Sequence, residues 1–462
     1  MLRSLPSRSQ PQTIATTVAP KNEAVLIVGG GTFGFSTALE LSEPQFTDIT
    51  VLDSGSELPS PLSAGCDLNK IVRVEYDDDF YTSLALDAVA EWKTPFFAPF
   101  YEQSGLINAT LSGGDEKDHK TLRRHLDSVA NRPGIPPGSI SCFESGDDIR
   151  ATAPQLTGSM EGWSGHMNRF GGFARAGKAM AAVHAQCRKN SVKFVLGADE
   201  GQAETLIFDG ARCIGARTRC GRVHRARRTI VALGAHVARL VPSIAPQITA
   251  KAWSVAHLHL SPAQADSMMG TPVVNCRDLG FFFEPDPDTG LLKLCAHRAG
   301  LTNYGRGETS VPPSSSSGLA PAGRIPREDN DKLVSLIKAA MPQFSSIPLT
   351  RRFICWCGDT TDSNFIIDFV PGTEDQSLLV FSGDSGHAFK MFPIAGRWAR
   401  EVLEQGEQKL DRWKWKGTPD GRPEDVSWRS GSLEELVDVK EWVGDEDDLA
   451  DGLSRHVGKS GL

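Results

Sequence analysis

Apolar runs alternate with a glycine-rich turn and a helical pattern near the start of the chain. Residues 24–28 (AVLIV) form a continuous apolar run, which is typical of a strand buried on both faces of a parallel sheet. The turn follows, then a helical pattern over 35–42 and a second apolar strand over 49–52. This order predicts a βαβ unit.

Three further buried strands are predicted much later in the chain. They cover 192–196, 229–233 and 377–382; a helix over 174–187 precedes the first, and a helix over 394–405 follows the last. We therefore predict a discontinuous Rossmann-type FAD- or NAD-binding domain. Its predicted parts are 23–90, 150–245 and 350–410.

The pattern changes between 246 and 349. Alternating segments such as 281–284 and 291–294 predict antiparallel strands, and an amphipathic pattern over 327–341 predicts a helix that a proline stops. Together with 91–149, this region is predicted to form an α+β substrate domain with an antiparallel sheet. The predicted fold class is α/β, with this second domain beside the Rossmann-type one.

The two ends of the chain differ from the rest. Residues 1–22 hold three bases and no acid, which favours a disordered arm, with a transit peptide as the alternative. Residues 411–462 are predicted to be an acidic C-terminal extension, because 418–462 alone carry −7 of the total charge of −8. The nearly neutral remainder offers no basic field for nucleic acid or anionic lipid.

Composition favours a soluble globular protein. The 462 residues are 40% hydrophobic, and no apolar stretch reaches the ~18 to 20 residues of a membrane-spanning helix. Nine cysteines are too sparse for a disulfide scaffold and fit a reducing compartment. We expect a cytoplasmic monomer, with mitochondrial import as the alternative. His257 and His259 lack further ligands at metal-binding spacing, so no metal site is predicted.

A G-x-G-x-x-G motif lies between the first strand and its helix, and an aspartate ends the second strand. The glycines permit a tight turn, close approach of a pyrophosphate and close helix packing, while the helix N-terminus favours the anion. The aspartate is expected to accept hydrogen bonds from a ribose. The motif alone does not choose between FAD and NAD. Its predicted cofactor contacts are Gly29, Gly31, Thr32, Phe33, Gly34 and Asp53.

Three further segments resemble the fungal fructosyl amino acid oxidases (amadoriases) and their monomeric sarcosine oxidase relatives. They are 63–73 (SAGCDLNKIVR), 355–368 (CWCGDTTDSNFIID) and 385–390 (SGHAFK). The likeness runs in order from about residue 23 to 405. The resemblance implies FAD as cofactor. It adds Ser63, Lys70, Cys355, Gly386 and Lys390 to the predicted cofactor contacts.

The same resemblance implies a covalent bond from the Cys355 sulfur to the 8α carbon of the flavin. Cys357, one residue further along, is absent from the family's pattern. It therefore remains the alternative sulfur.

Three residues are implied to be catalytic. Lys293, a charge inside an apolar strand, corresponds to a lysine beside flavin N5 that promotes reaction with oxygen as a fixed cation; a lysine exposed on an edge strand is the alternative. Lys70 is implied to lie against the flavin ring. His297 stands where amadoriases carry a glutamate and sarcosine oxidase a histidine. A neutral imidazole there can accept the amine proton, unless it only fills the wall of the site.

Arg73 and Lys390 match positions that hold the substrate carboxylate in sarcosine oxidase. Two cations would place the α carbon over the flavin by charge-assisted hydrogen bonds. A surface pair between Arg73 and Glu75 is the alternative.

We therefore predict an FAD-dependent amine oxidase. It would oxidise a secondary amine or N-substituted amino acid to an imine, which is hydrolysed or, in specialised metabolism, cyclised, while O2 becomes hydrogen peroxide. The alternatives are an amine dehydrogenase with another electron acceptor, a fructosyl amino acid oxidase, which His297 disfavours, and a flavin-binding protein without turnover.

Overall fold

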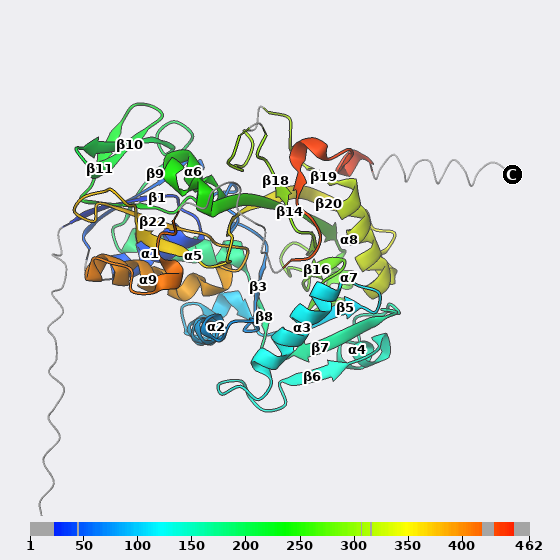
Figure 1. Cartoon of the computed structure of the whole chain (residues 1–462). Helices are drawn as coiled ribbons and strands as arrows, with labels where there is room; N and C mark the ends of the chain where they lie inside the picture. Colours follow the sequence, from blue (N-terminus) through cyan, green and yellow to red (C-terminus); the bar gives the residue numbers. More distant parts are fainter. Residues whose placement is uncertain (1–22, 44–45, 306, 315–316, 418–428, 448–462) are drawn as a thin grey trace, which may run out of the picture.

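The computed structural model describes residues 23–43, 46–305, 307–314, 317–417 and 429–447. The predicted N-terminal arm lies outside these residues, as do two parts of the predicted acidic extension, 418–428 and 448–462. Figure 1 shows two halves, with the long strand β14 (Ile248–His259) running from one toward the other.

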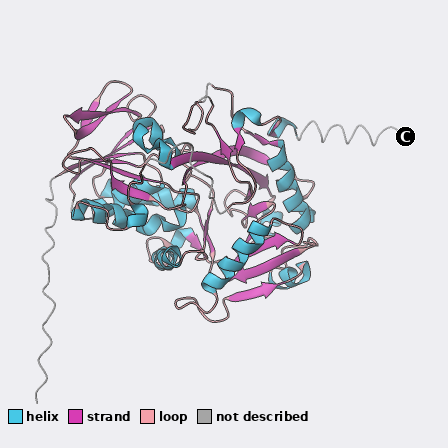
Figure 2. Ribbon diagram, viewed as in Figure 1, coloured by secondary structure: helices cyan, strands magenta, loops and turns pink. Residues whose placement is uncertain are grey.

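The first half is built on a six-stranded sheet in the order β21-β22-β13-β1-β2-β9. All neighbouring strands are parallel except β21 and β22. Helices α1 (Thr32–Ser42), α5 (Ala176–Lys189) and α9 (Phe392–Gln405) gather on one side of this sheet (Figures 1 and 2). The strands are β1 (Ala24–Val28), β2 (Asp48–Asp53), β9 (Lys193–Leu196), β13 (Arg228–Val231), β21 (Ile366–Phe369) and β22 (Leu378–Ser382).

An antiparallel three-stranded sheet covers the opposite face. Its strands are β10 (Ala203–Asp209), β11 (Arg212–Thr218) and β12 (Val223–Arg225). Cys213 and Ala216 of β11 share a buried cluster with Leu26 and Val231 of the six-stranded sheet. The parallel strands are thus buried on both faces, as their continuous apolar runs predicted.

The second half is built on a ten-stranded sheet in the order β23-β18-β14-β17-β16-β15-β5-β7-β6, with β20 also paired to β14. Its pairs are antiparallel except β15 with β5 and β18 with β23. The strands other than β14 are β5 (Leu106–Leu111), β6 (Ile140–Phe143), β7 (Trp163–Asn168), β15 (Val273–Cys276), β16 (Gly280–Phe282), β17 (Leu291–Ala296), β18 (Leu301–Thr302), β20 (Thr350–Thr360) and β23 (Glu434–Glu435).

Helices and two small sheets complete the fold. The helices are α2 (Asp79–Trp92), α3 (Glu116–Val129), α4 (Gly146–Thr152), α6 (Val237–Leu240), α7 (Pro262–Ser267) and α8 (Arg327–Ala340). One small sheet joins β3 (Lys70–Val72), β8 (Gly172–Ala174) and β4 (Tyr101–Glu102), and the other joins β19 (Arg324–Pro326) to β24 (Trp442–Gly444). Short 3-10 turns include η5 (Phe389–Met391).

The predicted fold class is confirmed: a mixed α/β chain with a parallel nucleotide-binding sheet and a second, largely antiparallel sheet. Two segments that we assigned to the nucleotide-binding domain, β7 and β20, contribute strands to the ten-stranded sheet. Sheet membership does not by itself set a domain boundary, so the boundaries stay a prediction. The first helix begins at Thr32 rather than Phe35, because Gly34, the last glycine of the motif, already belongs to its first turn.

Candidate active site

The glycine motif joins the carboxyl end of β1 to the start of α1. Gly29 has a φ of +108°, and a Cβ there would lie 2.4 Å from the Ala232 carbonyl oxygen. A Cβ at Gly34 would lie 1.8 Å from the carbonyl oxygen of Gly29. Gly31 is the N-cap of α1 and has no side chain with which to bind the first N–H groups of the helix. Those groups suit an anion such as a pyrophosphate.

Asp53 ends β2 and faces this motif. Its carboxylate accepts hydrogen bonds from the N–H of Gly30 at 2.8 Å and of Gly55 at 2.7 Å. The Ser63 hydroxyl lies 3.2 Å from the position of a Cβ on Gly31, so the structure brings the loop after β2 to the motif. The Phe33 side chain stacks on Phe381 in the core, with ring centroids 3.9 Å apart. Any cofactor contact at Phe33 would therefore come from its backbone.

Thr32 is the first residue of α1. The remaining predicted site residues lie around one cavity of about 160 Å³, which we call the inner cavity. It forms where β3, β14, β17 and β20 meet the turn that precedes α9. The predicted residues that line it are Lys70, Arg73, Lys293, His297, Cys355, Gly386 and Lys390.

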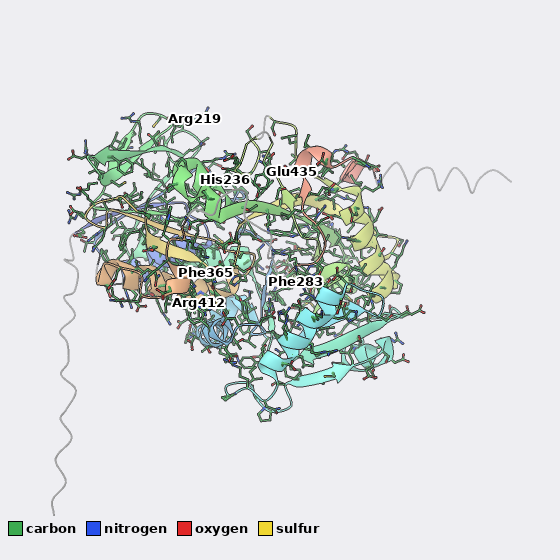
Figure 3. The ribbon with its side chains drawn as sticks, in the orientation of Figure 1. Arg219, His236, Phe283, Phe365, Arg412 and Glu435 are labelled. Atoms are coloured by element: carbon green, nitrogen blue, oxygen red, sulfur yellow. The ribbon has the colours of Figure 1, made fainter. Side chains whose placement is uncertain are left out.

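Lys293 and Lys70 share one buried carboxylate. Asp67 accepts hydrogen bonds from both ammonium groups, and the distance to Lys70 is 2.8 Å. Lys293 also donates to the carbonyl oxygen of Asn69 at 2.7 Å and lies over the ring of Phe283, which Figure 3 labels near the centre of the molecule. Burial would raise the pKa of Asp67, but the two lysines outweigh it and hold that pKa below its usual range.

The exposed-lysine alternative for Lys293 is wrong. Strand β17 lies between β14 and β16, and the Lys293 side chain is 1% exposed. An isolated charge is costly to bury, and the ion pair with Asp67 compensates the buried ammonium of Lys293. Its catalytic role stays a prediction.

Cys355 and Cys357 point to the same face of β20, since they are two residues apart on a strand. The Cys357 thiol hydrogen-bonds to Cys355 and lowers the pKa of the Cys355 thiol, outweighing burial. Lys70, whose Nζ is 4.0 Å from the Cys355 sulfur, lowers that pKa further. The same hydrogen bond and burial raise the pKa of Cys357. Cys355 is therefore the more readily ionised sulfur, and the thiolate is the reactive form.

Arg73 and Lys390 meet although 317 positions separate them in the sequence. The guanidinium carbon of Arg73 lies 4.9 Å, and Nζ of Lys390 5.1 Å, from the centre of the Tyr76 ring. Lys390 donates to the His387 carbonyl oxygen at 3.0 Å, and burial together with nearby Arg73 lowers the pKa of Lys390 well below its usual range. A surface pair of Arg73 with Glu75 is wrong, because Glu75 is fully buried and accepts from Asn168 at 2.8 Å.

His297 follows β17 and is neutral. Burial, and then the charges of Arg277, Arg429 and Lys332, hold the pKa of His297 well below its usual range. Nε2 of the imidazole donates to Oδ1 of Asn275, which lies 2.7 Å away and can only accept. In the neutral ring the lone pair is then on Nδ1, the nitrogen that can accept a proton.

Two arginines in the wall of the inner cavity were missed by the sequence analysis. Arg277 follows β15 and Arg429 belongs to the predicted acidic extension; both also line a second cavity of about 500 Å³, which we call the outer cavity. A cation directly after a buried strand was a usable signal for Arg277. The sequence around Arg429 has no periodicity that could have placed it here.

His257 and His259, which lacked further ligands in the sequence, do not form a second site. His257 is buried with Nδ1 3.2 Å from the carbonyl oxygen of Arg351, whereas His259 is exposed. Within the part of the chain that the structure describes, no group of three or more His, Cys, Asp or Glu side chains could hold a metal ion. None of the helices in that part has the length and apolarity needed to cross a membrane.

Comparison with known proteins adds a family and several relatives. The family model of FAD dependent oxidoreductases (DAO) matches residues 24–402. An L-saccharopine oxidase of Schizosaccharomyces pombe is 28% identical over 443 residues, covering 91% of this chain and 98% of the relative.

Solved structures agree with this match. The fructosamine oxidase Amadoriase II of Aspergillus fumigatus superposes with a TM-score of 0.81 at 31% identity, covering 92% of this chain and 98% of its own. A fructosyl peptide oxidase of E. terrenum gives a TM-score of 0.82 at 31% identity, with the same coverage.

Proposed function

The chain belongs to the FAD dependent oxidoreductase family and is an FAD-dependent oxidase of amino acid C–N bonds, and from this premise we propose that it oxidises an N-substituted amino acid held by Arg73 and Lys390. The product is an imine, and O2 is reduced to hydrogen peroxide. The observation that carries this proposal is the pair of cations beside the Tyr76 ring.

The described residues fit FAD at two places. The first turn of α1, the Gly29 and Gly34 contacts and Asp53 form a cradle that a Cβ would fill. About 320 positions later in the chain, Cys355 contributes a thiol with a lowered pKa to the inner cavity. When bound, FAD supplies a two-electron acceptor that is reoxidised by O2.

A substrate carboxylate suits the environment of Lys390. Burial and Arg73 both disfavour its protonated form, so an anion placed between the two cations would restore that charge and gain charge-assisted hydrogen bonds. The carboxylate would fix the α carbon and its nitrogen in one orientation.

His297 and Lys293 have separate roles in the proposal. Burial keeps His297 neutral, so its Nδ1 can accept a hydrogen bond from the substrate nitrogen and orient the amine toward the flavin. Lys293 keeps a fixed positive charge in the wall because Asp67 holds its ammonium. That charge stabilises negative charge as oxygen is reduced.

Cys355 is proposed to carry the flavin covalently. The flavin should then remain with the polypeptide after acid precipitation of the wild type, and Cys355→Ala should release it. Cys357→Ala is the matched control, because it removes a neighbouring thiol from the same strand face. Release of flavin by Cys357→Ala alone would move the bond to Cys357.

An amine panel tests the proposed reaction. Purified enzyme is mixed without oxygen with N-methyl amino acids, L-saccharopine, a fructosyl amino acid and N-methyl amines that lack a carboxylate, and flavin bleaching is recorded. We expect bleaching by N-substituted amino acids and about one peroxide per imine once air is admitted. Bleaching without peroxide would indicate a dehydrogenase, and bleaching by the fructosyl amino acid alone would favour the amadoriase activity.

The binding of the carboxylate has its own test. Arg73→Met and Lys390→Met should each weaken the binding of an amino acid substrate by about 2 to 5 kcal/mol, since each removes one charged partner of the substrate carboxylate. The double variant should lose less than the sum, because both residues hold one anion. Equal losses with an amine that has no carboxylate would refute this assignment.

A further inference from the structure

The inner cavity has a one-sided charge. Among the described residues, six cationic side chains and no acidic side chain line it. These cations are Lys70, Arg73, Arg277, Lys293, Lys390 and Arg429. A cavity with this lining favours an anionic ligand.

The six cations differ in their partners. Asp67, which does not line the cavity, is the counter-ion of Lys70 and Lys293. In the proposed function, one substrate carboxylate serves Arg73 and Lys390. Arg277 and Arg429 are paired with Asp118 and Asp359, but the proposed function gives neither arginine a role.

Both arginines lie where the inner cavity borders the outer cavity. Together with His297, they are the residues that line both the inner and the outer cavity. Suppose that the substrate nitrogen lies near His297 and that its N-substituent extends into the outer cavity. The substituent then passes Arg277 and Arg429, because both arginines border the two cavities.

We propose that the N-substituent of the substrate carries a second carboxylate, which binds between Arg277 and Arg429 at the boundary of the two cavities. This inference rests on the proposed function and narrows it to N-(carboxyalkyl) amino acids. The outer cavity, at about 500 Å³, would hold any remaining atoms of the substituent.

Both guanidinium groups are held in place before a substrate binds. Arg277 donates from Nε to Asp118 at 2.6 Å, and both side chains are at most 5% exposed. Arg429 donates to Asp359 at 3.1 Å and lies over the Trp253 ring, 3.8 Å from its centre. A guanidinium has five N–H donors and can contact two anions at once, so these acids orient the arginines without excluding a substrate carboxylate.

The position of Arg429 is set by the segment 429–447. Glu434 of this segment pairs with Arg298, and Glu435, labelled in Figure 3, accepts from the Thr302 hydroxyl at 2.8 Å and from the N–H of Tyr304 at 3.0 Å. Several acids of the predicted acidic extension thus attach it to the ten-stranded sheet. Arg429 is thereby presented to the cavity.

Matched substrates separate this inference from the proposed function. N-(carboxyalkyl)-L-alanines with two to five methylenes are compared with the corresponding neutral amides and with N-methyl-L-alanine. At one length or more, the acid should exceed its amide in kcat/KM by about 10- to 100-fold, the range of a charged hydrogen bond. Thioether analogues, in which sulfur replaces the amine, should show the same preference by calorimetry without turnover.

Variants locate the second carboxylate. Arg277→Met and Arg429→Met should remove most of the preference for acid over amide, whereas Arg277→Lys should retain part of it. Arg277→Met leaves the buried carboxylate of Asp118 without its ion-pair partner, so the single variant could fail to fold. The double variant Arg277→Met with Asp118→Asn removes that charge and serves as the test in that case. Arg217→Met, at an exposed position of β11, is the control for loss of one positive charge.

The outcomes are distinct. Acids and amides of equal activity at every length, or an unchanged preference in both arginine variants, would overturn the inference and leave the proposed function standing. Failure of every N-substituted amino acid, including N-methyl-L-alanine, to bleach the flavin would overturn the proposed function itself.

Discussion

Replacing Asp67 by Asn tests how the charges in the wall of the inner cavity are held. The change keeps the shape of the side chain and removes the charge that Lys293 and Lys70 share. Asp67 is 3% exposed and Lys293 1%, so the variant leaves a buried ammonium without its counter-ion. Breaking such a buried pair costs about 3 to 5 kcal/mol. Lys70 is 23% exposed, so loss of its ion pair with Asp67 should add less than about 1 kcal/mol to this cost, as for a surface pair.

Urea unfolding of the flavin-containing full-length protein measures this cost, as the shift in midpoint at constant slope. Asp288→Asn is the matched control, because Asp288 also accepts from a lysine, Lys178, at 2.7 Å but is 71% exposed. We expect at most about 1 kcal/mol for the control. A loss in Asp67→Asn no larger than in Asp288→Asn would refute the view that one buried carboxylate holds Lys293.

The pH dependence gives a second measurement of the same pair. The pKa of Asp67 is lower in the folded protein than in the unfolded chain, so its contribution is present above about pH 4, the unfolded value, and is lost as pH falls through the folded pKa. The stability difference between wild type and Asp67→Asn should therefore shrink as pH falls below about 4. A difference that stays constant on acidification would contradict the charge explanation.

Three further predictions follow from the site. Lys293→Met should slow reoxidation of the reduced flavin by oxygen by about 10² to 10³ in stopped-flow mixing, with little effect on reduction by the amine; unchanged reoxidation would remove the catalytic role. Gly34→Ala should abolish FAD absorbance in the purified protein, because its Cβ would meet the Gly29 carbonyl oxygen at 1.8 Å, whereas Gly113→Ala, with no described atom within 4 Å, should not. Because the pKa of His297 is lower in the folded protein than in the unfolded chain, the free energy of unfolding should fall as pH drops below about 6.5, by at most about 1.4 kcal/mol per pH unit for this group. In urea unfolding, His297→Gln should show a shallower fall than the wild type. An equal fall in both proteins would contradict the lowered pKa.

The nucleotide-binding half could be predicted closely because its signals are local. The run at 24–28 coincides with β1, and the helix predicted over 394–405 ends at the same residue as α9. Continuous apolar runs identify strands that are buried on both faces, and the glycine spacing leaves few alternatives to a tight turn followed by a helix. The structure and the comparisons confirm the predicted fold class.

The charges of the site were harder to predict because their partners are distant in sequence. Lys293 was recognised as a charge within an apolar strand, but its exposure depended on which strands flank β17, and pairing order is not written in a local pattern. Asp67 is 226 positions from Lys293, and nothing near either residue indicates the other. The resemblance identified the lysine, whereas only the fold shows what holds its charge.

The acidic extension shows how net charge can mislead. A run that carries most of the protein's charge is commonly a solvated tail, and that expectation ignored where each acid would find a base. In the described segment 429–447, Asp445 accepts from Arg352 at 2.8 Å and from the Thr350 hydroxyl at 3.0 Å, at the start of the strand that carries Cys355. Arg352 is fully buried on the same strand, so the acid compensates a charge that the core cannot leave alone. The extension therefore supports β20 from outside, while Arg429, the first residue of the described segment 429–447, reaches the inner cavity, and a substitution at Asp445 should alter cofactor retention as well as stability.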